Sequence, residues 1–186
     1  MIPFLYFETE IVSHMKVDPF IEKGEIKTFR TRNHRFISTL AVKVVSGSDK
    51  KALIIDGSAK IDPYWMVRIC KKLGLEEDEI LTKILLCRGF TAYQLRDMVG
   101  KAEEIVKNDD SIIFVGLIDL SSRFLEDLDG EEGTWLRARC VKKLRNLVLN
   151  RDIYCAVADP YVEIFESKLG GEIYGEKCAN LQGGTR

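Results

Sequence analysis

The stretch ALIIDGSAKIDPYWMVRICKKLGLEEDEILTKILLC, residues 52–87, holds two short apolar runs separated by helix-forming sequence. The runs ALIID (52–56) and KILLC (83–87) lack the alternation of a half-exposed strand, so they predict strands that are covered on both faces. Between them, PYWMVRICKKL (63–73) predicts a helix with its proline near the first turn, and GLEEDEIL predicts a second, shorter helix. A buried strand, a helical crossover and another buried strand indicate a parallel sheet with right-handed connections.

The same alternation continues downstream. SIIFVGLID (111–119) and IYCAVAD (153–159) predict two more covered strands, and residues 91–107 predict a helix that is capped by Thr91. A further helix is predicted by an apolar stripe of Leu136, Cys140, Leu144, Leu147 and Val148. Strands and helices therefore alternate along most of the chain, as in doubly wound α/β proteins.

The glycine-rich tail, residues 168–186, differs from this pattern. Its short β-prone pieces predict an antiparallel hairpin at the sheet edge, followed by a frayed end. No internal repeat and no long low-complexity linker divides the chain. We predict a single domain, residues 1–186, with three α/β/α layers around a mostly parallel sheet.

The composition excludes several classes of protein. The chain has 28 Lys and Arg against 29 Asp and Glu, so affinity for nucleic acid or membrane must come from a local patch. Five widely spaced cysteines without a CxxC pair indicate a reduced intracellular protein rather than a disulfide framework. No uncharged run approaches the ~20 residues that span a bilayer. We expect a cytoplasmic protein without a membrane partner, and two histidines without paired spacing predict no metal site.

Charged residues follow the predicted strands at the point where each strand ends. Three strands end in Asp56, Asp119 and Asp159, and a fourth runs into Arg88. Because the carboxyl ends of parallel strands face the crevice where ligands bind, we expect a charged rim there, with Gln94 facing it from the next helix. The alternative is that each aspartate simply caps the following turn or helix, which aspartate does well.

Residues 25–45, EIKTFRTRNHRFISTLAVKVV, predict a strand, a turn and an amphipathic helix, which is the arrangement that normally presents a phosphate-binding loop. The turn contains a basic group consisting of Arg30, Arg32, Asn33, His34 and Arg35. Cations at a helix N-terminus are unfavourable unless an anion compensates them, so one hypothesis is that these side chains bind a phosphate. The alternative is a solvent-facing turn, or one whose arginines pair with rim carboxylates such as Asp56 or Asp119.

An acidic segment, RFLEDLDGEEG (123–133), precedes the basic segment RARCVKKLR (137–145). We expect an exposed loop followed by a helix with a solvated charged face. The second interpretation is a DNA-contacting surface made by Arg137, Arg139, Lys142, Lys143 and Arg145, which would bind with a steep salt dependence. No aromatic residues interleave these cations for base stacking.

The segment LIIDGSAKIDPYWMVRICKKLGLEEDEILTKILLCRGFTAYQLRDMV resembles the central part of the RecA/RadA-type recombinase ATPases, especially archaeal RadA-like paralogs. In that family a strand ending in Asp is followed by a helix, a GL…E-IL helix, and a strand that leads into an R-x-F-x-x-x-Q pattern. Here the pattern is Arg88, Phe90 and Gln94. GEIKTF…LAVKVV resembles the strand and helix that flank the Walker A loop, and SIIFVGLIDL stands where Walker B is expected. The likeness covers about residues 24–160 and implies a RecA-like fold of the P-loop NTPase type.

The residues of the nucleotide site depart from that family. A working G-x-x-x-x-G-K-[ST] loop wraps backbone N–H groups around the phosphates, and its Lys and Ser/Thr contact the γ-phosphate and Mg²⁺. The family's Gly-Lys-Thr positions align with Arg32, Asn33 and His34. After LIID the family places a glutamate that activates water, whereas this chain has Gly57 and Ser58. The Walker B strand carries Gly116, and its nearest carboxylate is Asp119.

The resemblance therefore implies a non-catalytic accessory or regulatory protein of DNA recombination or repair, with a degenerate nucleotide site and no bound cofactor. Its expected partner is a recombinase or another RecA-like protein, or a second copy of itself, with DNA reached through a local basic patch. Two alternatives stay open. One is an ATP-binding protein or weak Mg-ATPase that grips phosphate with an arginine-rich loop, and the other is a structural scaffold unrelated to DNA.

Overall fold

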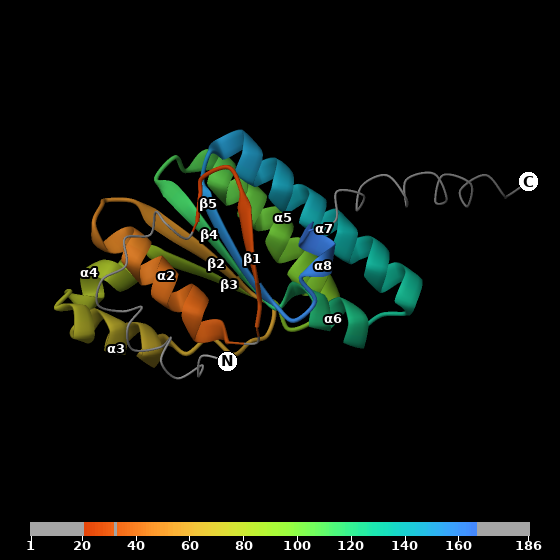
Figure 1. The fold of residues 1–186 in the computed structure, drawn as a ribbon, viewed down its shortest axis with the longest axis horizontal. Coiled ribbons are helices and arrows are strands. Elements are labelled where there is room, and N and C mark those ends of the chain that lie inside the picture. The colour runs from red at the N-terminus through yellow and green to blue at the C-terminus, as the bar shows by residue number, and fades with distance from the viewer. Residues whose placement is uncertain (1–20, 32, 167–186) are drawn as a thin grey trace, which may run out of the picture.

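The computed structural model describes residues 21–31 and 33–166 of the chain. Its strands form one five-stranded sheet in the order β1-β5-β4-β2-β3, and each strand runs parallel to its neighbours (Figure 1). The strands are β1 (Ile26–Arg30), β2 (Lys51–Asp56), β3 (Ile84–Arg88), β4 (Ile112–Ile118) and β5 (Tyr154–Asp159). The predicted parallel sheet is confirmed, with strand ends within one residue or so of those expected. The predicted hairpin at 168–186 lies outside the described residues.

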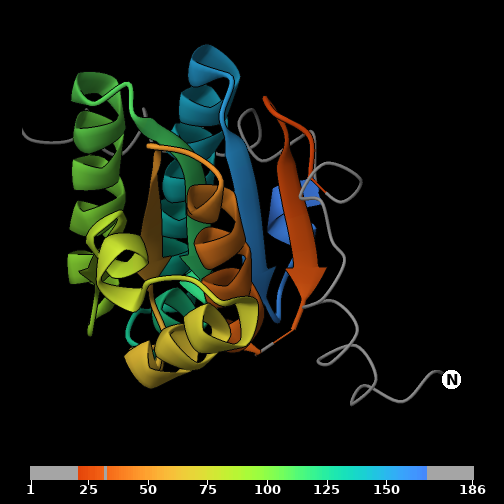
Figure 2. The same cartoon turned by 90° about the vertical axis from the view of Figure 1, so that its left-hand side faces the viewer.

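Helices connect these strands and lie on both faces of the sheet. They are α2 (His34–Ser46), α3 (Pro63–Leu73), α4 (Glu77–Thr82), α5 (Ala92–Asn108), α6 (Leu120–Glu126), α7 (Gly130–Arg151) and α8 (Glu163–Glu166). In Figure 2, α2, α3 and α4 cover the face of the sheet nearer the viewer, and α5 and α7 lie behind it. The arrangement is therefore α/β with helices on both sides, which is compatible with three layers. Among the described residues, no helix is both long and apolar enough to cross a membrane.

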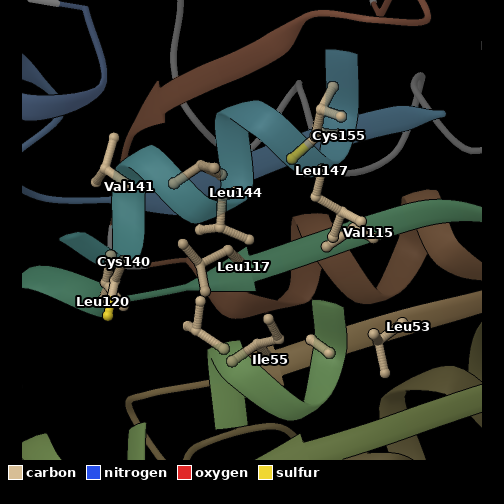
Figure 3. Packing of buried hydrophobic residues seen from close by; sticks show 14 of the residues in the cluster. Leu53, Ile55, Val115, Leu117, Leu120, Cys140, Val141, Leu144, Leu147 and Cys155 are labelled. Carbon is tan, nitrogen blue, oxygen red and sulfur yellow. The ribbon is translucent and has the colours of Figure 1, made fainter. Parts of the chain in front are cut away.

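The two hydrophobic clusters explain why the strand sequences lack alternation. Leu53 and Ile55 of β2 pack with α5 and α7, while Ala52 and Ile54 of the same strand pack with α2 and α3. Figure 3 shows the first cluster, in which α7 side chains meet those of β4, β2 and β5. In the three inner strands, β2, β4 and β5, nearly every residue is buried whichever face it points to, so apolar side chains are favoured at consecutive positions.

Helix ends follow the capping signals in the sequence. Thr91 caps α5 by accepting a hydrogen bond from the backbone N–H of Gln94, as predicted, and Asp62 caps α3 in the same way through Tyr64. Gly74 ends α3 with φ 67°, a left-handed conformation that glycine adopts without a side-chain clash.

The side chain of Ile37 on α2 packs directly against Gly116 of β4. A Cβ atom on Gly116 would lie 2.4 Å from Cγ2 of Ile37 and 3.0 Å from Cε1 of Phe114. Real Cβ atoms do not approach other atoms so closely, so glycine is required for this packing distance. Ile37 of α2 therefore occupies the space that a carboxylate side chain at position 116 of β4 would need.

The prediction of an exposed loop at 123–133 is wrong for most of that segment. Helix α6 continues to Glu126, and α7 begins at Gly130. The reason is Phe124, which is fully buried together with Leu120, one helical turn before it. The acidic residues that follow Phe124 hid the helical spacing.

Candidate functional site

The carboxyl edge of the sheet gathers the charged residues that the sequence predicted there. Asp56 and Arg88 are opposite each other at the ends of β2 and β3, and Asp159 is opposite Arg30 at the ends of β5 and β1. Asp119 follows β4 directly, and its backbone N–H donates to the carbonyl of Ala158 on β5. The strands thus bring these residues to one rim, because parallel strands end on the same side of a sheet.

Asp56 is fully buried and surrounded by donors. Its Oδ1 accepts hydrogen bonds from the backbone N–H (3.1 Å) and the hydroxyl (2.7 Å) of Ser58. Its Oδ2 accepts from the backbone N–H of Ile61 (3.0 Å) and from Nε of Arg88 (3.2 Å). Arg88 also donates to the carbonyl oxygen of Ile61 at 3.1 Å. The pair therefore fixes the loop that follows β2, which is the structural role that the capping interpretation predicts.

The other two rim carboxylates also hold backbone groups. Asp159 is fully buried and accepts hydrogen bonds from the N–H groups of Ser121 (2.9 Å) and Tyr161 (2.7 Å). Burial raises the pKa of Asp159, and these two hydrogen bonds oppose the increase. Asp119 has φ 51° and caps α6 through the N–H of Ser122. All three aspartates thus serve as caps for the segment after their strand.

Gln94 closes the turn between β3 and α5. Its Oε1 accepts a hydrogen bond from the backbone N–H of Phe90 at 2.9 Å, which places its side chain over the start of the helix. The R-x-F-x-x-x-Q pattern of the sequence therefore corresponds to two structural contacts. Arg88 secures the loop after β2, and Gln94 secures the turn after β3.

The described residues of the basic group after β1 do not form one cluster. Arg30 pairs with Glu163 of α8 and donates to the carbonyl oxygen of Pro160. Asn33 caps α2, accepting from the backbone N–H of Arg35 at 3.0 Å. Arg35 itself lies over the ring of Trp65, 4.7 Å from its centroid. Arg32 lies outside the described residues.

His34 is the first residue of α2. Its pKa is lowered mainly by burial, and Arg35 and Lys60 lower it further, while Asp56 and Asp62 act in the opposite direction. His34 is therefore within electrostatic range of both the rim and the start of α3. A neutral imidazole is the favoured form at pH 7.

The connection between β1 and α2 does not fit a nucleotide phosphate group. Strand β1 ends at Arg30 and α2 begins at His34, so only residues 31–33 connect them. A G-x-x-x-x-G-K-[ST] loop is longer than this, and it needs glycines to turn its N–H groups inward. No glycine lies between Gly24 and Gly47, and no lysine occupies the helix start. The residues present therefore do not fit Mg-ATP in the manner of a P-loop.

The position after Asp56 also has no room for a carboxylate side chain. A Cβ atom on Gly57 would lie 2.4 Å from the backbone oxygen of Asp119 and 3.0 Å from that of Ile118. The N–H of Gly57 donates to the same Ile118 oxygen at 2.8 Å, which holds the backbones of β2 and β4 together. A water-activating glutamate at 57 would require these two backbones to separate.

The basic residues of α7 point in different directions rather than along one stripe. Arg145 donates to the carbonyl oxygen of Phe165, and Lys143 lies 3.7 Å from Glu103 of α5. Arg139 lies over the ring of Trp135 at 4.6 Å. Arg137 contributes to lowering the pKa of Glu163, after the larger effect of Arg30, and Lys142 is exposed.

Sequence reasoning missed the contacts of Trp65. Two guanidinium groups lie within 6 Å of its ring centroid, Arg35 at 4.7 Å and Arg68 at 5.9 Å. The indole Nε1–H donates to the hydroxyl of Thr39 on α2 at 3.1 Å, which fixes the ring between the two helices. The spacing of Trp65 and Arg68 along α3 was visible in the sequence, but the approach of Arg35 from α2 was not.

Within the described ranges, no group of three or more His, Cys, Asp and Glu side chains is arranged to hold a metal ion. Comparison with protein-family models gives no match, and comparison with curated proteins also gives none.

Proposed function

We propose that this chain is a non-catalytic RecA/RadA-like domain that acts as an accessory or regulatory protein in DNA recombination or repair. The observation that supports the non-catalytic part is the engagement of the rim carboxylates. The oxygens of Asp56 accept hydrogen bonds from the loop after β2 and from Arg88. Those of Asp159 accept from the N–H groups of Ser121 on α6 and of Tyr161. Catalysis of phosphoryl transfer consists mostly of positioning and charge stabilisation, which requires such groups to face a ligand.

The link to recombination rests on the sequence resemblance, which includes the R-x-F-x-x-x-Q pattern at Arg88, Phe90 and Gln94. The parallel sheet and the buried ends of β2 and β4 are what such a domain requires. A regulatory role needs only this framework and a surface that meets a recombinase or a second copy of the chain.

The first test measures nucleotide binding and turnover. The purified chain is melted with and without excess Mg-ATP, and phosphate release is followed in parallel. A ligand present at a hundredfold its Kd would add about 2.7 kcal/mol to the free energy of unfolding. We expect no such stabilisation and no release of phosphate. Stabilisation that is lost in Arg35→Ala would instead support the ATP-binding alternative, and turnover would refute the proposal.

The second test measures association. The chain is mixed with an active RecA-like recombinase from the same organism, and complex formation is followed by light scattering while strand exchange is assayed. We expect a complex and an altered rate of exchange. The absence of a complex, together with an unchanged rate, would favour the scaffold alternative.

A further inference from the structure

We propose that the surface formed by Arg35, Lys60, Tyr64, Trp65 and Arg68, which we call the Trp65 surface, binds single-stranded nucleic acid. It lies where the start of α2, the loop after β2 and the first turns of α3 meet. This inference does not depend on the proposed relation to recombinases, because it rests only on the contacts of these side chains.

Two of the three cations of this surface lie near an aromatic ring, and all three are weakly neutralised. Trp65, fixed by its hydrogen bond to Thr39, holds the guanidiniums of Arg35 and Arg68 against its ring. Among the described residues, neither Arg35 nor Lys60 forms an ion pair with a carboxylate.

The carboxylates nearby are too few or too deeply buried to balance these charges. Arg68 reaches Asp62 only at 3.9 Å, and Asp62 is also occupied in capping α3. Asp56, the other carboxylate close to His34, is fully buried and paired with Arg88. Cations gathered in this way leave a local positive potential on a chain whose net charge is -1.

The exposed ring of Tyr64 indicates which kind of polyanion this positive surface binds. Tyr64 is 75% exposed, four residues before Arg68 on α3, so the two side chains lie on the same face of the helix. An exposed ring beside phosphate-binding cations is the combination that binds unpaired bases, because every base offers a face for stacking. A duplex hides those faces, so single strands are the preferred ligand.

The arrangement gives a quantitative expectation for salt. If Arg35, Lys60 and Arg68 each neutralise one phosphate, log K should fall against log salt with a slope of about -2 for a single strand. Raising NaCl from about 50 mM to about 200 mM should then weaken binding roughly 20-fold.

The test is a fluorescence anisotropy titration of a labelled oligothymidylate of about 16 nucleotides, the upper range for a single binding module. Arg68→Glu should weaken binding at least about 10-fold and make the salt slope shallower. Tyr64→Ala should weaken it roughly 5-fold or more without changing the slope, and Tyr64→Phe should restore it. The matched control is Lys101→Glu, which makes the same change of sign on an exposed residue of α5, on the opposite face of the sheet.

Three outcomes would overturn the inference. The first is no binding at about 50 mM salt. The second is equal weakening by Lys101→Glu and Arg68→Glu, and the third is unchanged affinity in Tyr64→Ala. Competition by polyglutamate as effective as that by oligothymidylate would show a general polyanion site instead. Because Tyr64 and Arg68 are exposed, all variants should melt like the wild type, which separates binding effects from misfolding. None of these results bears on ATP turnover, so the proposed function is tested separately.

Discussion

Replacement of Arg88 by methionine tests whether the rim is structural. Arg88→Met keeps most of the apolar stem but removes the hydrogen bond to Asp56 (3.2 Å) and that to the carbonyl of Ile61 (3.1 Å). Asp56 would remain fully buried, with its charge supported only by Ser58 and Ile61. Removal of one partner from a buried ion pair costs about 3–5 kcal/mol.

We expect the lower end of that range, about 3 kcal/mol, because three hydrogen bonds to Asp56 remain and water reaches the partly exposed Arg88 side. For a domain of this size the midpoint of thermal unfolding should fall by roughly 6–12 °C. Arg88→Lys keeps the charge but cannot make both contacts, so its stability should lie between that of the wild type and that of Arg88→Met.

The assay is urea unfolding followed by far-UV circular dichroism, with the slope against urea compared between variants. The control is Arg96→Met, which removes an exposed pair with Asp97 and should change stability by less than about 0.5 kcal/mol. A double-mutant cycle with Asp56→Asn isolates the interaction of the pair. If Arg88→Met proves as mild as Arg96→Met, the pair does not hold the loop, and the structural role of the rim carboxylates is refuted.

Three further predictions concern packing and pH. Gly116→Ala should destabilise the fold by about 1–3 kcal/mol through overpacking against Ile37. In urea unfolding, the double variant Gly116→Ala/Ile37→Ala should lose less stability than the sum of the two single variants, and strict additivity would contradict the close approach of α2. The hydrogen bond from Lys51 lowers the pKa of Asp109 to about 2, so the stability that this group contributes is present above pH 3.8 and lost on acidification toward pH 2. In Asp109→Asn, the free energy of unfolding should therefore depend less on pH in that window, and a pH profile identical to that of the wild type would contradict this. Burial lowers the pKa of His34 below 6.5, so the contribution of this side chain to stability is present above pH 6.5 and lost as pH falls. His34→Gln should therefore remove part of the pH dependence of the melting temperature below pH 6.5, and an NMR titration that gives His34 a normal or raised pKa would contradict this.

The sequence was sufficient for the strands and most helices. Runs such as ALIID could be assigned because a strand covered on both faces needs consecutive apolar residues, whichever face each one meets. The cap at Thr91 could be predicted because capping depends on residues three apart in the chain. The segment 123–133 was predicted wrongly because the burial of Phe124 depends on a core that its charged neighbours do not reveal.

The candidate site could be predicted only in part. That charged residues gather at the carboxyl edge follows from parallel strands alone, and the sequence contained that information. The sequence did not show which groups these charged residues pair with. Asp56 and Arg88 are far apart in the chain, and Arg30 pairs with Glu163 rather than with a rim aspartate. Likewise, nothing local to Arg35 predicts that it lies on Trp65. Local propensity and periodicity act over a few residues and so determine elements, whereas hydrogen bonds and ring contacts act between side chains that only the packing of α2, α3 and the sheet brings within reach.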